Sequence, residues 1–565
     1  MTPGPGLAGR ARRPSWLVVV IALVLSPLGT RPAGAHPVEP APPSVDVCSI
    51  ERSADSPGEA IGTGTSDRDR FEEFSPFRVT KYPCPRAPDV RSLYVAPGVL
   101  ELTEGGRLAR RIDFPSSAQG PVSFEAIVEA VADPEWATEV EPGVFELTAA
   151  FVQAPGTTVT IAAPRVQTLR LVDRPGVFFG GRGATARFEG VAVTSWSRER
   201  QAPDEEPADG RPFVLYQEAA RLDVVNSEMS YLGSDRGSAY GVAWRLGGST
   251  GEVLGSTFAH NFFGVYTFEA TGIVFRDNVF RDNILYGFDP HDFTTGLVVE
   301  DNVAYGNGSH GFIVSRGVTD SVLRRNHSHD NAGNGIMMDS SSDRNRIEAN
   351  LVENNAKDGI VLLGSADNVV VDNVVRGNRV GIRVNGLEST ANRIEGNLIE
   401  GHEIGLQAYG GAADMVAIDN TVLDSSQMGM ALEAPRSQVG GGEIRRAPRG
   451  VGIRTATSLS GMRISDVDEG VVVAATGIAD LEQLQVSARE SSLRVEDGGL
   501  IELRGSTMIP PPPFDQPSAP ADDNAWLPFA GVAAILTALL LELIRWRRER
   551  HDDVTPAPAQ VWNRA

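Results

Sequence analysis

The sequence is poor in cysteine, in aromatic residues and in helix-type periodicity. Only two cysteines occur among 565 residues, which is too few for a metal site, and aromatic residues make up 7% of the chain. Lys and Arg number 51 against 73 Asp and Glu, so the net charge is −22. This excess of acid argues against nucleic acid as a partner, because a phosphate-binding face needs clustered cations. Abundant Gly and recurrent Asn favour one long object.

The N-terminal segment 1–35 has the layout of a secretory signal peptide. Several arginines precede an apolar run at 16–28, and the small residues around Ala35 fit a cleavage site. The run is short and early for a membrane span. We therefore expect the mature protein to begin near His36, outside the cytoplasm.

Residues 36–90 form the next segment, which is rich in Pro, Ser and acidic residues and shows no clear period. We interpret it as a loosely structured leader. It contains both cysteines, Cys48 and Cys84. Because they follow an export signal, we expect one disulfide that closes a loop; two free thiols are the alternative.

From residue 240 onward the chain repeats with a period of 22 to 24 residues. One column of the repeat is a Gly followed by an apolar residue: Gly241, Gly264, Gly287, Gly311, Gly335, Gly359, Gly381, Gly405 and Gly429. A second column is an Asn: Asn278, Asn302, Asn326, Asn350, Asn373, Asn397 and Asn420. Two columns that stay in step over so many copies indicate a solenoid.

The repeat predicts an all-β fold, a right-handed parallel β-helix over residues 91–509. A leucine-rich repeat would need a Leu/Asn consensus that is absent, whereas short Val/Ile segments with Gly, Asn and Asp corners suit a β-helix. One Asn per coil can stack on the next copy about 4.8 Å away, and Asn tolerates left-handed backbone at a corner. Right-handed coiling is the default for parallel crossovers.

The C-terminal part of the sequence predicts a membrane anchor. A Pro-rich tether at 510–525 leads to the apolar segment 526–544, which has Trp near both ends and the length of a single span. Arginines follow it, so residues 545–565 are expected to form a cytoplasmic basic tail.

Strand parity predicts which side chains of each coil face outward. Residues one and three after each Gly are mostly apolar and should point into the core, so residues two and four should face out. The outward residues form two columns: Tyr266, Asp289, Ile313, Met337, Val361 and Arg383, then Phe268, His291, Ser315, Asp339, Leu363 and Asn385.

The coil at 286–292 is the one that carries clustered titratable side chains in this outward position. Asp289 and His291 should lie side by side on the outer surface, and Pro290 between them should distort the strand because it cannot donate to a ladder. Arg316 lies one coil later, within reach of His291. With the apolar residues of the first column as an exposed flank, the cluster resembles a ligand groove.

The motif YGFDPHD at 286–292, followed by HGFIVSR at 310–316, resembles the signature of the mannuronan C5-epimerases, which are right-handed β-helix enzymes. Further similarity is found at 142–161, around Trp196, at 211–216 and at 226–244, and extends to about Asn420. The resemblance thus covers an epimerase-like core at about 142–420.

This resemblance implies an uronate C5-epimerase whose catalytic residues are His291, Arg316, Asp289 and Tyr286. His291 would remove the C5 proton, and Arg316 would neutralise the substrate carboxylate. Asp289 and Asp292 would orient the His and bind the sugar, while Tyr286 or a water would return the proton. The remaining residues expected to bind substrate are Asp292, His310, Asp339 and Arg383. No cofactor and no metal site is expected.

The chemistry explains why such residues are needed. Removal of a proton beside a carboxylate develops a second negative charge, so a cation on the carboxylate and a neutral His as base both lower the barrier. A polyuronate lyase is the mechanistic neighbour, and a non-catalytic glycan-binding scaffold is the alternative of another class. The expected partner is a polyuronate or, given the acidic chain, another uronate-containing glycan, bound by an exported, membrane-anchored monomer.

Overall fold

The computed structural model describes residues 90–115, 120–235 and 239–509. These residues form an all-β, right-handed solenoid of about 15 turns, as the sequence predicted. The expected signal peptide, the Cys48–Cys84 disulfide, the tether and the C-terminal anchor lie outside this part of the chain. Among the described residues, no helix is long and apolar enough to cross a membrane.

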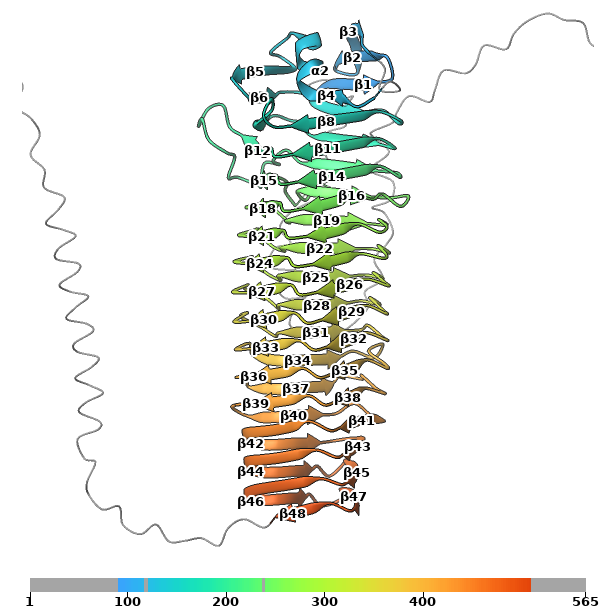
Figure 1. Cartoon of the computed structure of the whole chain (residues 1–565), viewed down its shortest axis with the longest axis vertical. Helices are drawn as coiled ribbons and strands as arrows, with labels where there is room; N and C mark the ends of the chain where they lie inside the picture. The colour runs from blue at the N-terminus through green and yellow to red at the C-terminus, as the bar shows by residue number, and fades with distance from the viewer. Residues whose placement is uncertain (1–89, 116–119, 236–238, 510–565) are drawn as a thin grey trace, which may run out of the picture. The chain divides into compact units, whose positions relative to one another are not determined.

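Each regular coil contributes one strand to each of three parallel stacks (Figure 1). We name the stacks the β20, β21 and β22 faces, after the three strands of the coil that ends in Asp289-Pro290-His291. The β22 face comprises β1 (Arg91–Ala96), β7 (Ala150–Gln153), β10 (Phe179–Arg182), β13 (Val214–Gln217), β16 (Val242–Arg245), β19 (Val265–Phe268), β22 (Phe288–His291), β25 (Phe312–Ser315), β28 (Ile336–Asp339), β31 (Ile360–Leu363), β34 (Val380–Asn385), β37 (Ile404–Tyr409) and β40 (Met428–Leu432).

The other two faces complete the coil. The β21 face comprises β6 (Val144–Leu147), β9 (Thr168–Val172), β12 (Ala192–Trp196), β15 (Glu228–Ser230), β18 (Thr257–Ala259), β21 (Val279–Arg281), β24 (Val303–Tyr305), β27 (His327–His329), β30 (Leu351–Glu353), β33 (Val374–Arg376), β36 (Leu398–Glu400), β39 (Thr421–Leu423) and β48 (Thr507–Ile509). The β20 face comprises β4 (Val122–Ser123), β8 (Thr158–Ala162), β11 (Thr185–Glu189), β14 (Arg221–Val225), β17 (Glu252–Leu254), β20 (Val274–Arg276), β23 (Val298–Glu300), β26 (Val322–Arg324), β29 (Arg346–Glu348), β32 (Val369–Val371), β35 (Arg393–Glu395), β38 (Val416–Ile418), β41 (Ser437–Gly440), β43 (Ala456–Ser460), β45 (Ile478–Glu482) and β47 (Leu500–Arg504).

Toward the C-terminal end the β21 and β22 faces merge. Three long strands, β42 (Glu443–Ile453), β44 (Arg463–Val473) and β46 (Gln485–Val495), each run across both faces. The strands of these coils pair in parallel like the others.

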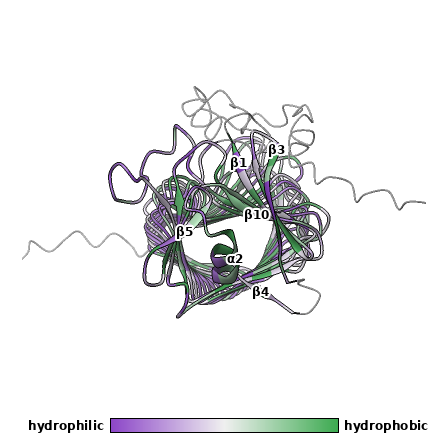
Figure 2. Cartoon of the chain, turned by 90° about the horizontal axis from the view of Figure 1, so that it is seen from above, coloured by the Kyte–Doolittle hydropathy of each residue, from purple (hydrophilic) through white to green (hydrophobic). Residues whose placement is uncertain are grey.

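The N-terminal end is closed by elements that depart from the parallel pattern. Strand β1 pairs with β7 in parallel but also with β2 (Val99–Glu104) in antiparallel, and β3 (Arg107–Asp113) follows β2; β5 (Ala137–Glu141) likewise pairs with β6 in antiparallel. The helix α2 (Phe124–Val131) lies within the ring of strands when the solenoid is viewed from above (Figure 2).

The sequence reasoning missed α2, because the segment is only eight residues long. Its apolar residues nevertheless have helical spacing: Phe124, Ile127, Val128 and Val131 are all buried, and Ser123 caps the first turn by accepting a hydrogen bond from the amide of Ala126. The helix therefore seals the apolar interior of the first coils from water.

The glycine column is stacked as predicted, and the reason is close approach between coils. A Cβ on Gly359 would lie 2.6 Å from the carbonyl oxygen of Gly381, and one on Gly381 would lie 2.5 Å from that of Gly405. No side chain fits there, because the carbonyl belongs to the backbone of the next coil.

The asparagine column is also confirmed as a continuous ladder. The Oδ1 atom of Asn302 accepts from both the amide and the Nδ2 atom of Asn278, at 3.0 and 2.9 Å, and the same pair of bonds recurs along the column. The left-handed backbone, however, belongs to the residue before each Asn, such as Asp277 (φ 56°) and Asp301 (φ 59°). The expectation that the Asn adopts it was wrong, because the Asn must keep its amide directed along the ladder.

The inward residues of the β22 face form the core that parity predicted. Phe312 and Val314, like their counterparts in the neighbouring coils, are fully buried in one continuous apolar cluster. Full burial of each such side chain stabilises the folded state by roughly 1.5–3 kcal/mol. The stable stack of coils in turn holds the outer side chains at fixed positions.

Candidate active site

The Asp289-Pro290-His291 segment forms the end of β22. Asp289 stands in register with Tyr266 on β19, and His291 stands in register with Phe268. Toward β25 the ladder keeps only the pair Phe288–Phe312, although β25 and β28 then pair over four residues. The distortion predicted at Pro290 is therefore confirmed, since proline has no N–H to donate.

His291 and Asp292 form a hydrogen-bonded pair at the end of this strand. Nδ1 of His291 lies 2.5 Å from Oδ2 of Asp292, and both side chains are about one-fifth exposed. Burial alone would lower the pKa of His291, but the hydrogen bond to Asp292 and the charges of Asp289 and Asp292 outweigh it and raise the pKa above its ordinary value. The contact expected between the imidazole and one of the two aspartates is made by Asp292.

The chain turns sharply directly after His291. Asp292 and Phe293 both have left-handed backbone, with φ of 34° and 57°, and the amide of Phe293 donates to the carbonyl of Arg316 at 3.0 Å. Asp292 thereby points back along the strand to the imidazole, and Arg316 is held one coil away. Left-handed backbone also follows the neighbouring strands of this face, at Glu269, Arg316 and Ser340, so the turn belongs to the repeat.

Arg316 contacts the aspartate of the pair and lies on the same side of the solenoid. Its Nη1 atom is 3.8 Å from Oδ1 of Asp292, and its side chain is 55% exposed. Asp292 thus stands between the imidazole and the guanidinium, with one oxygen toward each. The exposed guanidinium can turn toward a ligand carboxylate at little cost.

Asp289 is a buried carboxyl group, which corrects the expectation that it lies on the open surface. It is 2% exposed, and its Oδ1 atom has no hydrogen-bond partner. Burial raises the pKa of Asp289 to about 7, with a further contribution from the charges of Asp292 and Asp339 and an opposing one from His291. Its carboxyl therefore titrates near neutral pH, in the same range as a histidine.

The apolar flank is likewise buried instead of exposed. Ile313, Met337 and Val361 are 6%, 3% and 0% exposed, although they lie outside the continuous apolar core. Side chains that stack at the strand spacing of about 4.8 Å cover one another from above and below, and parity does not report this effect. The expected exposed apolar groove is therefore wrong.

Two tyrosine rings, those of Tyr266 and Tyr286, lie near the site. Tyr266 lies with its ring centre 5.7 Å from that of His291, and burial raises its pKa well above the ordinary value, so it stays a phenol at neutral pH. Tyr286 stacks on His310 at 5.5 Å with nearly parallel rings and packs on Phe263 at 5.0 Å. Both tyrosines are less than one-tenth exposed.

His310 has a clear structural contact in addition to this stack. It is 4% exposed, and its Nδ1 atom accepts a hydrogen bond from the amide of Asn334 at 2.9 Å. This hydrogen bond connects the Tyr286–His310 ring pair to the next coil.

Asp339 and Arg383 lie further along the same face. Asp339 is in register with Ser315, whose hydroxyl donates to it at 3.0 Å. Arg383, on β34, is four strands beyond β22, which corresponds to about 19 Å, and forms an ion pair at 2.9 Å with the fully buried Asp358. The structure thus brings Asp339 within two coils of His291 and leaves Arg383 distant from it.

Arg245 is a site neighbour that the sequence reasoning missed. It is in register with Phe268, which is in register with His291, and its guanidinium carbon lies 4.8 Å from the centre of the Phe268 ring. It is 5% exposed, and burial lowers its pKa. Arg245 is the fourth residue after Gly241. Extending the second outward column by one coil toward the N-terminus would therefore have identified it.

A protein-family model described as "Right handed beta helix region" matches residues 176–320 and 292–422. The mannuronan C5-epimerase of Pseudomonas aeruginosa is 33% identical over 167 residues, which cover 27% of this chain and 30% of that protein. The enzyme of the same name from Pseudomonas syringae pv. tomato is 28% identical over 188 residues, covering 31% and 34%. The mannuronan C5-epimerase AlgG of Azotobacter vinelandii is 29% identical over 167 residues, covering 27% and 31%.

Among solved structures, the chain is similar to the crystal structure of the periplasmic alginate epimerase AlgG. The sequence identity is 24%, the TM-score is 0.48, and the likeness covers 69% of this chain and 84% of that chain. The matches to the curated relatives span about a third of their length. They confirm the resemblance that the motifs at 286–292 and 310–316 indicated.

Proposed function

We propose that this chain, which is similar to the mannuronan C5-epimerases over about a third of their length, inverts C5 of uronate residues in an exported polysaccharide. The observation that supports this most is one arrangement of three side chains. A histidine, an aspartate and an exposed arginine meet at one point of the β22 face, with Asp292 between His291 and Arg316. These are the groups that proton abstraction beside a carboxylate requires.

The hydrogen bond to Asp292 prepares His291 to act as the base. A carboxylate oxygen accepts from a protonated Nδ1, so the neutral imidazole carries its lone pair on Nε2. Nε2 would take the C5 proton. The charges that raise the pKa of His291 also make it a stronger base and stabilise the imidazolium that forms.

Arg316 would bind the carboxylate of the substrate residue whose C5 proton is removed. Loss of the proton moves negative charge onto this carboxylate, and the guanidinium stabilises that charge more than it stabilises the ground state. Its contact with Asp292 is a long one at 3.8 Å, which a substrate carboxylate can replace.

Inversion needs a proton from the opposite face of the sugar. We propose Tyr286 or a water molecule as this donor. Tyr266 contacts the imidazole ring and is therefore placed beside the base. Tyr286 packs on His310 and Phe263 instead, and its phenolic O–H group can donate a proton.

The rest of the β22 face would hold the polymer on either side of the reacting residue. Asp289 and Asp292 would orient the histidine and the sugar. His310, Asp339 and Arg383 would contact other sugar residues of the polymer, with Arg383 the furthest from the reacting one. We propose that the chain works outside the cytoplasm as a monomer, held by its C-terminal segment. The acidic net charge favours a glycan less densely charged than a polyuronate, or a medium in which salt screens the repulsion.

The test is proton exchange from deuterated water. The full chain is incubated with polymannuronate and with a panel of uronate-containing glycans, and the products are examined by NMR. Deuterium at an inverted C5 is the expected result. An unsaturated product would assign the site to β-elimination and overturn the epimerase, and binding without exchange on every glycan would leave the non-catalytic scaffold as the function.

A further inference from the structure

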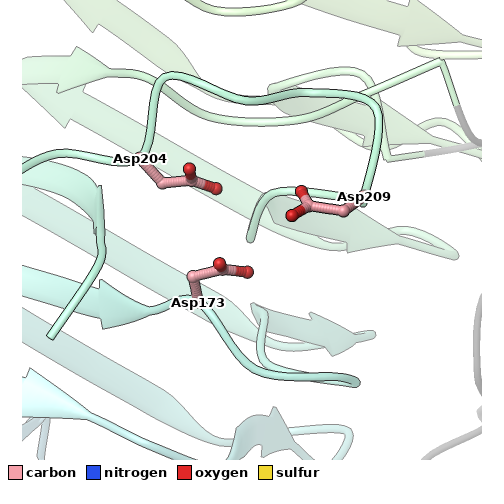
Figure 3. Close-up of side chains that lie close together, drawn as sticks. All are labelled: Asp173, Asp204 and Asp209. Atoms are coloured by element: carbon pink, nitrogen blue, oxygen red, sulfur yellow. The ribbon is translucent and has the colours of Figure 1, made fainter. Parts of the chain in front are cut away.

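Three aspartates that are far apart in the sequence come together beside the loop between β12 and β13. Asp173 follows the end of β9, whereas Asp204 and Asp209 lie in the loop at 197–213. One carboxylate oxygen from each lies within 4.8 Å of the others. Figure 3 shows the three side chains turned toward one another. Composition and motif spacing predicted no metal site, because about a coil of sequence separates Asp173 from Asp204 and Asp209.

The decisive member is Asp204, which is completely buried. Its Oδ1 atom accepts from the side chain of Arg200 and, at 3.2 Å, from the amide of Glu206. Its Oδ2 atom is buried and has no hydrogen-bond partner. An unsatisfied oxygen of a buried carboxylate costs free energy, and a bound cation is the kind of group that removes this cost.

The main chain of Asp204 is held in place by β12. The amide of Asp204 donates to the Ser195 hydroxyl at 3.2 Å, and the same hydroxyl donates back to the Asp204 carbonyl at 3.2 Å. Asp173 is anchored as well, through its amide to the carbonyl of Trp196 at 2.9 Å. The main chains of Asp173 and Asp204 are therefore held by β12, while Asp209 is an exposed residue of the loop.

From this geometry we propose a Ca²⁺ site formed by Asp173, Asp204 and Asp209. Carboxylate oxygens are ligands for hard cations, and no histidine or cysteine belongs to the cluster, which disfavours Zn²⁺. Ca²⁺ accepts six to eight oxygen ligands in variable geometry, so water can complete the shell on the exposed side at Asp209. The ion joins the loop at 197–213 to the end of β9, and this role is independent of the epimerase chemistry.

Direct binding tests the site. The full chain is treated with a chelator, freed of it, and titrated with Ca²⁺ without any glycan and in moderate salt, which screens the acidic surface. One saturable site is expected. Asp209→Asn is expected to weaken it by about tenfold or more, because affinity depends on the number of charged ligands. Asp204→Asn should also weaken Ca²⁺ binding. If Asp204→Asn does not fold, the exposed Asp209→Asn variant still tests the site.

Glu205→Gln is the matched control, because Glu205 is an exposed carboxylate in the same loop and lies outside the cluster. It is expected to bind Ca²⁺ like the wild type. A second readout is trypsin cleavage after Arg200, which Ca²⁺ should slow in the wild type and in Glu205→Gln but not in Asp209→Asn. Absence of saturable uptake, equal uptake by Asp209→Asn, or saturation by Mg²⁺ at the same concentration would overturn the proposal.

Discussion

The imidazole Nδ1 of His291 and the carboxylate of Asp292 are 2.5 Å apart although the two residues are neighbours in the chain. In an extended strand, neighbouring side chains point to opposite faces. The left-handed backbone at Asp292 reverses this direction and folds its carboxylate onto the ring. The pair is thus a product of the turn that ends β22, and its chemistry depends on that turn.

Asp292→Asn is predicted to move the acid side of the pH–rate profile to lower pH. Asp292 raises the pKa of His291, so its removal lowers that pKa, and the neutral base persists in more acidic solution. The plateau of kcat/KM should also fall, because the imidazole loses its orientation. Asp330→Asn is the matched control, since Asp330 bonds His329 at 2.7 Å on the β21 face. An unchanged or upward-shifted acid limb in Asp292→Asn would contradict the assignment.

Asp289→Asn is predicted to stabilise the protein at alkaline pH. The pKa of Asp289 is about 7 in the folded state, whereas an unperturbed aspartate has a pKa of 3.8, so the folded state binds the extra proton between these values. Stability is therefore lost as the pH rises from about 4 to about 7, by an amount on the order of a few kcal/mol. The variant lacks this loss.

Chemical unfolding of wild type and Asp289→Asn at pH 5 and pH 8 measures the effect. The difference in unfolding free energy between the two proteins should grow in favour of the variant at pH 8. Titrating groups that do not interact with Asp289 cancel in this difference, whereas His291 does not, because the charge of Asp289 acts on its pKa. A constant difference between the two pH values would show that Asp289 ionises normally.

Gly359→Ala is predicted to destabilise the solenoid strongly. The added Cβ would lie 2.6 Å from the carbonyl oxygen of Gly381 and still closer to Cγ1 of Val375. Overpacking of this kind typically costs about 1–3 kcal/mol, and the backbone contact leaves little room for relief. Gly364→Ala is the control, because a Cβ there meets nothing within 4 Å and only the left-handed φ of 54° opposes it. Equal unfolding midpoints for the two variants would contradict the stacking account.

Tyr286→Phe is predicted to lower turnover by about a hundredfold if its hydroxyl returns the proton. Tyr266→Phe is the comparison, because this buried ring lies beside the base. Removal of its hydroxyl should affect the orientation of His291 and not the return of the proton. Initial rates of C5 inversion by NMR separate the two. Turnover by Tyr286→Phe within about twofold of the wild type would assign the proton donor to water.

The fold followed from the sequence because its repeat reports contacts between coils directly. Gly359 and Asn302 are required at fixed positions by a neighbouring backbone, so their period is the period of the structure. A second ladder, which includes Asn283 and Asn307, was missed although it has the same spacing. The helix α2 was missed because a single short element has no period to reveal it.

The site was predicted in part. Parity and register located Asp289 beside His291 and placed Arg316 one coil away, because both depend only on strand geometry. Burial was predicted incorrectly, since it depends on how the stacked side chains cover one another. The contact of Arg316 with Asp292 followed from the left-handed turn, which the sequence Asp-Pro-His-Asp does not specify.

The central claim is that His291 is the base, and C5 deuterium incorporation by His291→Asn tests it most directly. The control is His329→Asn, because His329 is also bonded through Nδ1 to the next aspartate but lies on the β21 face. On the best substrate found in deuterated water, His329→Asn should match the wild type. His291→Asn should bind the glycan but incorporate deuterium about a hundred- to ten-thousand-fold more slowly. Incorporation by His291→Asn at the wild-type rate would remove His291 from the mechanism and contradict the account.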